Sequence, residues 1–231
     1  MKKILAVLLT LTFVFALTAC GGGSDPAAKS EGVMTYAEYA AAALDSEVTI
    51  EAYVQGKQSW WEDKATVYAQ DPDGAYFLYE MACSEADYAK LTTGTKIKVT
   101  GYKAEWAGEV EIIDATFTIG EGTWTAEPTD VTALLGTDTL IDHQNQLVSF
   151  KGMTVESIEY KNGEPGDDIY VNLSYNGASY SFCVEAYLTG ADTAVYTAVG
   201  ELVAGDVVDI EGFLYWYEGV NTHITGVTKV G

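Results

Sequence analysis

The stretch LTTGTKIKVTGY, residues 91–102, recurs later in the chain as LVAGDVVDIEGF, residues 202–213. In both copies apolar and polar residues alternate after the first glycine, which is the pattern of a half-buried β-strand. Three glycines keep one spacing in the two copies: Gly94, Gly101 and Gly108 against Gly205, Gly212 and Gly219. This internal repeat predicts that the chain folds as two copies of one structural unit.

Turn signals place further strands around each repeat. Asp73-Gly74 and Asn176-Gly177 stand between alternating runs, and such dipeptides predict hairpins whose two turn residues have positive φ. The first copy is expected to form strands over 47–57, 65–70, 75–82, 95–103 and 109–119, with a helix over 85–91. The second copy is expected to form strands over 146–160, 167–175, 178–186, 206–215 and 219–229, with a helical stretch near 191–199.

Three strands, a helix and two further strands follow one another in each copy. Each copy therefore resembles a bacterial extracytoplasmic OB-fold domain, a small five-stranded barrel. The resemblance implies a mainly β protein of two tandem OB-fold-like barrels, each with a short helix between strands three and four, and it says little about the ligand. Short helices over 36–44 and 128–135 are expected to lead into the two barrels.

The beginning of the chain has the pattern of an export signal. Lys2 and Lys3 precede an apolar run over 4–19, which is shorter than the roughly 20 residues that span a membrane. Residues 17–20, LTAC, resemble the bacterial lipobox. The resemblance implies cleavage before Cys20, acylation of its sulfur, and anchoring at the outer, extracytoplasmic face of the cell membrane. An ordinary cleaved signal with an incidental cysteine is the alternative.

These features divide the chain into five segments. We expect a signal peptide over 1–19, a lipidated cysteine and flexible tether over 20–32, a first barrel over 33–120, a linker over 121–128 and a second barrel over 129–231. The glycine-rich start of the tether has little to bury, and a linker this short favours two barrels packed at a fixed angle.

The composition is strongly acidic. The formal net charge is −22, and every basic residue other than histidine is a lysine. Nucleic-acid binding draws most of its affinity from cationic side chains on phosphates, so neither DNA nor RNA is expected as a ligand. Glycans, cationic peptides and envelope proteins remain open as partners. The alternative is that the charge only keeps an exported protein soluble.

Two loops of the first copy bring tryptophans and carboxylates towards the end of the barrel where OB-folds bind ligands. The candidate residues there are Trp60, Trp61, Glu62, Asp63, Glu105 and Trp106. The second copy offers Tyr215, Trp216, Tyr217 and Glu218 in its last loop. Aromatic faces with carboxylates suit sugars or cationic groups. The alternative is that these rings cap the barrels or fill the interface between them.

No residue pattern indicates a catalytic site, a metal site or a cofactor. His143 and His223 stand apart, with no nucleophile motif near either. The acidic turns over 71–74 and 164–168 match no spaced calcium loop, and turn formation explains them. Cys83 and Cys183 could pair outside the cell or lie buried as small apolar residues.

The sequence therefore predicts a lipid-anchored extracytoplasmic binding protein, not an enzyme, with a glycan or a cationic peptide as the candidate ligand. A structural module that contacts another envelope protein is the alternative. Under that alternative, Trp60, Trp61 and Trp106 should be buried. A hydrolase of envelope polymers is a remoter alternative, and it would need two facing carboxylates in a cleft.

Overall fold

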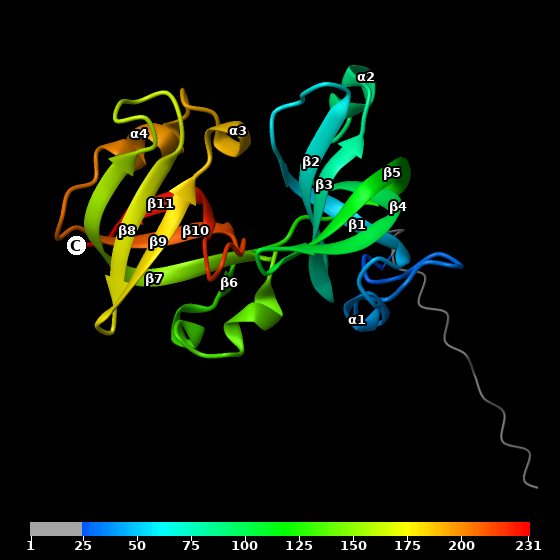
Figure 1. Ribbon diagram of the computed structural model, residues 1–231, viewed down its shortest axis with the longest axis horizontal. Coiled ribbons are helices and arrows are strands. Elements are labelled where there is room, and N and C mark those ends of the chain that lie inside the picture. Colours follow the sequence, from blue (N-terminus) through cyan, green and yellow to red (C-terminus); the bar gives the residue numbers. More distant parts are fainter. Residues whose placement is uncertain (1–24) are drawn as a thin grey trace, which may run out of the picture.

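A computed structural model describes residues 25–231 and contains two β-barrels side by side (Figure 1). The predicted signal peptide and Cys20 lie outside the described residues. None of the helices between residues 25 and 231 is long and apolar enough to cross a membrane. The first barrel is built from α1 (Tyr36–Ala41), β1 (Glu47–Lys57), β2 (Lys64–Asp71), β3 (Gly74–Ala82), α2 (Glu85–Tyr88), β4 (Thr95–Trp106) and β5 (Glu109–Thr123).

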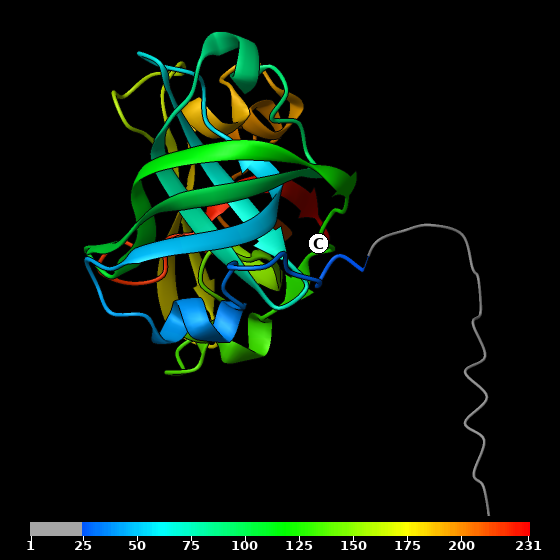
Figure 2. The ribbon, with the colours of Figure 1, turned by 90° about the vertical axis from the view of Figure 1, so that its right-hand side faces the viewer.

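The strands of the first barrel close in the order β1-β2-β3-β5-β4. β1 pairs antiparallel with β2 and β4, and β3 meets β5 in a short parallel pairing at Phe77 and Leu78. This order, with a helix between the third and fourth strands, confirms the predicted OB-fold-like barrel. Figure 2 shows α1 and α2 at opposite ends of it.

The second barrel repeats this plan. Its elements are β6 (Thr129–Asp130), two 3-10 turns (Thr132–Leu134 and Leu140–His143), β7 (Leu147–Tyr160), β8 (Ile169–Tyr175), β9 (Ala178–Val184), α3 (Ala186–Thr189), α4 (Ala194–Gly200), β10 (Val207–Phe213) and β11 (His223–Lys229). β7, β8, β9, β11 and β10 follow one another around the sheet, and a β10–β7 pairing closes it. The two copies inferred from the sequence therefore share one topology.

The repeated glycines have a common structural cause. Gly94 and Gly205 open the fourth strand of each barrel with φ of 88° and 94°, which favours glycine. At Gly101 a Cβ atom would lie 2.7 Å from the Ile113 carbonyl oxygen, and at Gly212 it would lie 2.3 Å from that of His223. Both sit beside a register shift in the strand pairing, so the neighbouring backbone comes too close for a side chain.

The two predicted hairpins differ. Asn176 and Gly177 both have positive φ, as predicted for that turn. Neither Asp73 nor Gly74 does; instead Asp71 Oδ1 accepts bonds from both of their backbone N–H groups, at 2.7 and 3.0 Å. The prediction of positive φ was wrong for this turn, because the Asp71 side chain makes it.

The segment before the second barrel also departs from its prediction. A helix was expected over 128–135, but Thr129 and Asp130 form β6, parallel to Val148 and Ser149 of β7. β8 pairs with β7 only from Thr154 onward, which leaves that side of β7 free for β6. A 3-10 turn follows. The helices expected over 36–44 and 85–91 are present but end earlier, at Ala41 and Tyr88.

Part of the predicted tether is bound to the first barrel. The Lys29 side chain is mostly buried, and its ammonium lies 2.5 Å from Asp71 Oδ2 and 2.7 Å from the Glu51 carbonyl oxygen. Asp71 is fully buried and also accepts a bond from the Tyr76 hydroxyl. The described end of the tether is therefore fixed against β1 and β2.

Each barrel has its own apolar core, and a third, smaller cluster joins them. Its buried members are Tyr68 and Phe77 of the first barrel and Phe213 of the second. Gly56 leaves room for this contact, because a Cβ there would lie 2.7 Å from the Phe213 ring. Backbone bonds cross the interface too, from Glu218 N–H to the Ala107 carbonyl at 2.7 Å. The relative placement of the barrels is thus set by packed rings and directed hydrogen bonds.

Candidate ligand-binding site

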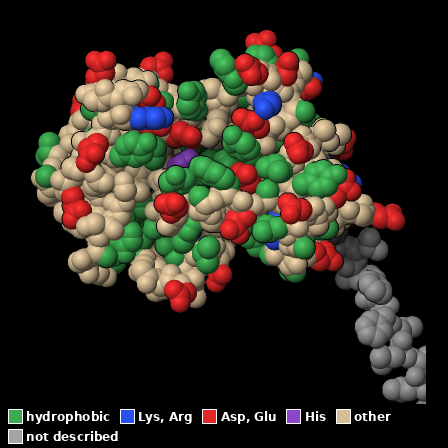
Figure 3. All heavy atoms as spheres, in the orientation of Figure 1, with side chains coloured by type: hydrophobic (Ala, Val, Ile, Leu, Met, Phe, Trp, Pro, Cys, Tyr) green, Lys and Arg blue, Asp and Glu red, His purple; other side chains and the backbone are tan. Residues whose placement is uncertain are grey.

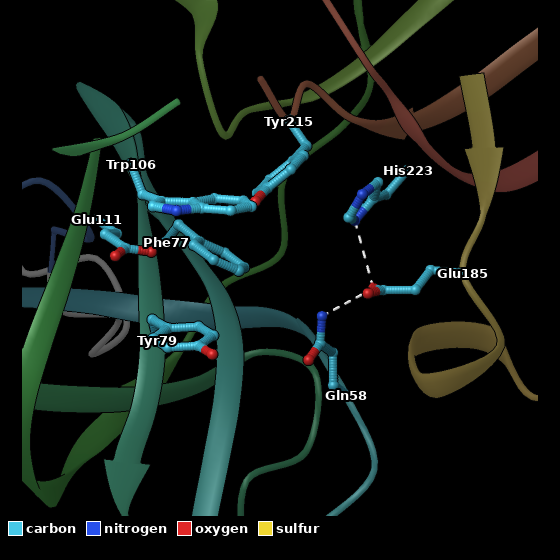
Figure 4. Close-up of a pocket in the computed structure, with 8 residues that line it drawn as sticks. All are labelled: Gln58, Phe77, Tyr79, Trp106, Glu111, Glu185, Tyr215 and His223. Carbon is cyan, nitrogen blue, oxygen red and sulfur yellow. Dashed lines mark hydrogen bonds and ion pairs between the residues drawn. The ribbon is translucent and has the colours of Figure 1, made fainter. Parts of the chain in front are cut away.

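A pocket of about 430 Å³ opens where the two barrels meet. Its lining residues come from both barrels: Gln58, Phe77, Tyr79, Trp106, Glu111, Glu185, Tyr215 and His223 (Figure 4). On this side of the molecule, hydrophobic side chains gather along the junction between the barrels (Figure 3). Because β3 alternates in and out of the barrel, Phe77 and Tyr79 point outward while Tyr76 and Leu78 fill the core.

A chain of polar contacts crosses the pocket floor from one barrel to the other. Gln58 donates its amide N–H to Glu185 Oε2 at 2.7 Å, and the same oxygen lies 3.3 Å from His223 Nδ1. His223 Nδ1 also lies 2.9 Å from the hydroxyl of Tyr68, which is fully buried. These contacts fix the orientation of the Glu185 carboxylate and of the imidazole ring.

The aromatic walls of the pocket are packed against one another. Tyr215 stacks on His223 with ring centroids 4.3 Å apart and meets Phe77 edge-on at 5.3 Å. Trp106, 56% exposed, packs against Tyr217 at 5.2 Å. Each wall ring therefore has a partner that limits its movement, which gives a largely preformed site.

The pocket is acidic, and no lysine lines it. Burial and the nearby Glu80 raise the pKa of Glu111, which has no hydrogen-bond or ion-pair partner among the described residues. Burial raises the pKa of Tyr215 as well, and the surrounding carboxylates add to that shift. Glu111 thus has no cationic neighbour among the described residues, so a bound cation would stabilise its ionised form.

A third carboxyl group lies between the barrels and outside the pocket lining. Glu109 is fully buried, and its Oε2 accepts the Trp216 backbone N–H at 2.9 Å. Burial raises the pKa of Glu109 to about 8. Its Oε1 and the Asn145 Oδ1 are both buried with no hydrogen-bond partner among the described residues. A proton on Glu109 would remove the charge that burial disfavours.

The first-barrel candidates do not form one cluster. Trp106 lines the inter-barrel pocket, whereas Trp60 and Trp61 line a neighbouring pocket of about 320 Å³. The Trp60 indole is half-buried and donates to the Cys83 carbonyl at 2.8 Å, while Trp61 is 70% exposed. The binding hypothesis expects all three rings to be exposed and close together; Trp61 and Trp106 are exposed, but they line different pockets.

The predicted carboxylates of these loops lie outside both pockets. Glu62 and Asp63 are exposed at the tip of the β1–β2 loop, where both have positive φ. Glu105 is exposed near the end of β4 and lines neither pocket. These carboxylates therefore do not join the tryptophans in either pocket.

The second-barrel candidates have different positions. Tyr215 lines the inter-barrel pocket, and Tyr217 extends its aromatic wall through Trp106. Trp216 packs against the second core instead, and Glu218 stands in a turn with φ of 54°. Only the two tyrosines therefore belong to the site.

Sequence reasoning missed six pocket residues: Gln58, Phe77, Tyr79, Glu111, Glu185 and His223. One signal was available. Residues 76, 77 and 79 are all aromatic, which places rings on both faces of β3. Glu185 and His223 carried no such signal, because only the packing of the barrels brings them to the pocket.

Between residues 25 and 231 no group of three or more histidine, cysteine or acidic side chains could hold a metal ion. Asp71 is used by its turn and by Lys29, and Asp168 pairs with Lys161 at 2.8 Å. Cys83 and Cys183 are free thiols, both buried. They do not form the disulfide that the sequence left open.

No protein-family model matches the chain, and no curated protein matches it in sequence. Solved structures resemble it weakly. A murine DNA-binding protein bound to double-stranded DNA is 11% identical with a TM-score of 0.38, over 79% of this chain and 96% of that one. The Ifi202 HINa domain in complex with double-stranded DNA is 12% identical with a TM-score of 0.35, over 80% and 98%. A single-stranded DNA-binding protein from Thermus aquaticus is 13% identical with a TM-score of 0.25, over 80% and 94%.

These comparisons correct one expectation. Nucleic acid was excluded as a partner from the net charge, yet the structures similar to this chain include proteins bound to DNA. Net charge averages over the whole surface and does not describe a local site, so it was too coarse a ground for that exclusion.

Proposed function

We propose that this protein is an exported lipoprotein, anchored through acyl chains on Cys20, that binds a positively charged ligand in the inter-barrel pocket. The lipobox resemblance over 17–20 supports the anchor. Lys29 is held against the first barrel, so only a short segment after Cys20 would separate that barrel from the membrane. Ligand binding, with no chemical conversion of the ligand, is the proposed role.

One observation carries the proposed ligand class: two carboxylates and four aromatic rings line the same pocket without a lysine. An ammonium or guanidinium group over the face of an aromatic ring is attracted by its quadrupole, by roughly 0.5–2 kcal/mol. Glu185 is held in place by Gln58, so its carboxylate needs little ordering when a cation arrives. Glu111 has no hydrogen-bond or ion-pair partner among residues 25–231 that a ligand would have to displace.

The alternative is a module that only contacts another envelope protein. It predicts that the tryptophans are buried. Trp61 and Trp106 are exposed, and the inter-barrel contact is made by other rings, those of Tyr68, Phe77 and Phe213. Exposed aromatic side chains around a pocket that has room for a ligand favour binding over a purely structural role.

A comparison of ligand classes tests the proposal. Full-length protein in detergent is titrated with a capped lysine amide, a neutral chitin trisaccharide and short double- and single-stranded DNA. Acrylamide quenching of tryptophan fluorescence and calorimetry report binding. We expect the lysine amide to bind and to protect Trp106. Binding of DNA or of the sugar without binding of the amine would overturn the cationic assignment.

A further inference from the structure

The pocket of about 320 Å³ adjoins the inter-barrel pocket, and the two have Gln58 and Tyr79 in common. The other residues of this second pocket are Ser59, Trp60, Trp61, Lys64, Thr66, Glu80 and Tyr187. The Lys64 ammonium is paired with Glu80 at 2.5 Å, so its charge is compensated within the pocket. Trp61 and Tyr187 are both mostly exposed and give this pocket an aromatic, nearly neutral character.

We infer that the two pockets are subsites for one extended peptide, which places a basic side chain in the inter-barrel pocket and an apolar side chain, two residues away, in the second pocket. This inference rests on the proposed function and names the class of ligand. The apolar side chain of the peptide would occupy the second pocket, which a bound cationic group alone leaves empty.

The spacing of the rings fits such a chain. Phe77 belongs to the first pocket and Tyr79 to both, and their ring centroids are 6.3 Å apart. In an extended peptide, side chains two residues apart lie on one face at a distance of about 6.5–7 Å. A peptide lying along β3 would therefore present every second side chain to successive pockets, while adjacent side chains would face opposite ways.

The shared Gln58 offers a group for the peptide backbone. Its amide nitrogen must face Glu185, because a carboxylate accepts and does not donate. Its oxygen is directed away from Glu185 (Figure 4) and has no hydrogen-bond partner among the described residues. That oxygen lies where both pockets meet, so it can accept a backbone N–H between the two bound side chains.

Charge argues for a basic peptide over a second copy of this chain. The chain carries a formal charge of −22, so two copies facing each other across these pockets would repel, whereas a basic peptide is attracted. A neutral glycan could stack on the exposed rings, but it would leave Glu111 without a counter-charge.

Two peptides of identical composition test the spacing. Capped lysine-glycine-phenylalanine and capped lysine-phenylalanine-glycine are titrated into full-length protein, with the capped lysine amide as reference. We expect the first peptide to bind about tenfold more tightly than the amide, since its phenylalanine buries apolar surface in the second pocket. The second peptide should gain less than twofold.

Matched variants assign the gain to the second pocket. Trp61→Ala should remove the tenfold gain and leave the affinity for the lysine amide unchanged. Tyr102→Ala, at an exposed ring on β4 outside both pockets, should change neither. Equal affinity for the two peptides, or a gain that survives Trp61→Ala, would overturn the two-subsite inference while the proposed function stands. A lysine amide that fails to bind would remove both.

Discussion

The ring of Tyr68 in the first barrel lies flat on that of Phe213 in the second, with centroids 4.3 Å apart and an interplanar angle of 5°. The Tyr68 hydroxyl reaches past this contact to His223 at 2.9 Å. This pair therefore connects the apolar joint between the barrels to the polar floor of the pocket. A change in how the barrels pack would therefore alter the shape of the pocket and the affinity for its ligand.

Truncation of this joint should weaken both stability and binding. Phe213→Ala removes a buried ring and should lower the free energy of unfolding by about 3–5 kcal/mol. It should also weaken binding of the lysine amide, because Glu185 and Glu111 come from different barrels. Urea unfolding followed by circular dichroism measures the first effect. Val203→Ala, at an exposed site in the second barrel, is the control and should cost under about 0.5 kcal/mol.

Glu109 should make stability depend on pH. Its pKa is raised to about 8 by burial, so the folded state holds its proton while the unfolded state releases it near the ordinary value of 4.5. The stabilisation is complete below about pH 4.5 and is lost as pH rises towards 8, at roughly 1.4 kcal/mol per pH unit within that window. Denaturant titrations across this range measure it.

Glu109→Gln mimics the protonated acid, because its amide is neutral across this pH range. The variant should therefore match the wild type near pH 5 and exceed it in stability at pH 9. A constant difference between the two proteins across the range would show that Glu109 titrates normally in the folded state.

The buried ion pair of Lys29 should matter far more than an exposed one. Lys29→Met leaves the Asp71 carboxylate buried without its counter-charge and should cost about 3–5 kcal/mol. The same change at Lys90, whose pair with Asp87 is exposed, should cost under about 1 kcal/mol. Thermal unfolding of the two variants at one pH compares them. Similar losses would mean that Lys29 is not held against the barrel.

The anchor at Cys20 can be tested apart from the pocket. Cys20→Ser should move the protein from the membrane fraction to the soluble fraction, since the acyl chains supply the membrane affinity. Mass spectrometry of the N-terminal peptide from wild type should find a lipid-modified cysteine at its first position. An unmodified Cys20, or membrane association that persists in Cys20→Ser, would contradict the lipoprotein assignment.

Much of the fold could be predicted because its signals are local. Alternation around Ile97 and Val99, and glycines where strands meet closely, recur in both copies and predict the barrels. β6 could not be predicted, since it depends on which part of β7 its neighbour leaves unpaired. The residues of β6 were expected to form a helical turn, but their pairing with β7 determines their conformation.

The site was predicted only in part, for a related reason. Trp106 ends β4 and Tyr215 lies in the loop after β10, positions that the strand order brings to the barrel ends, so their place followed from the topology. Glu185 and His223 reach the pocket only through the packing of one barrel on the other. No pattern within either copy carries that information. Trp60, by contrast, was predicted to contact a ligand, but its indole N–H donates a hydrogen bond to the Cys83 carbonyl.

The central claim is that the acidic, aromatic inter-barrel pocket binds a cation, and Glu111 tests it most directly. Calorimetric titration of the capped lysine amide into wild type, Glu111→Gln and the exposed control Glu105→Gln isolates that carboxylate. We predict an affinity about tenfold weaker for Glu111→Gln, equivalent to about 1.4 kcal/mol, and no change for Glu105→Gln. Equal affinities for all three proteins would contradict the account.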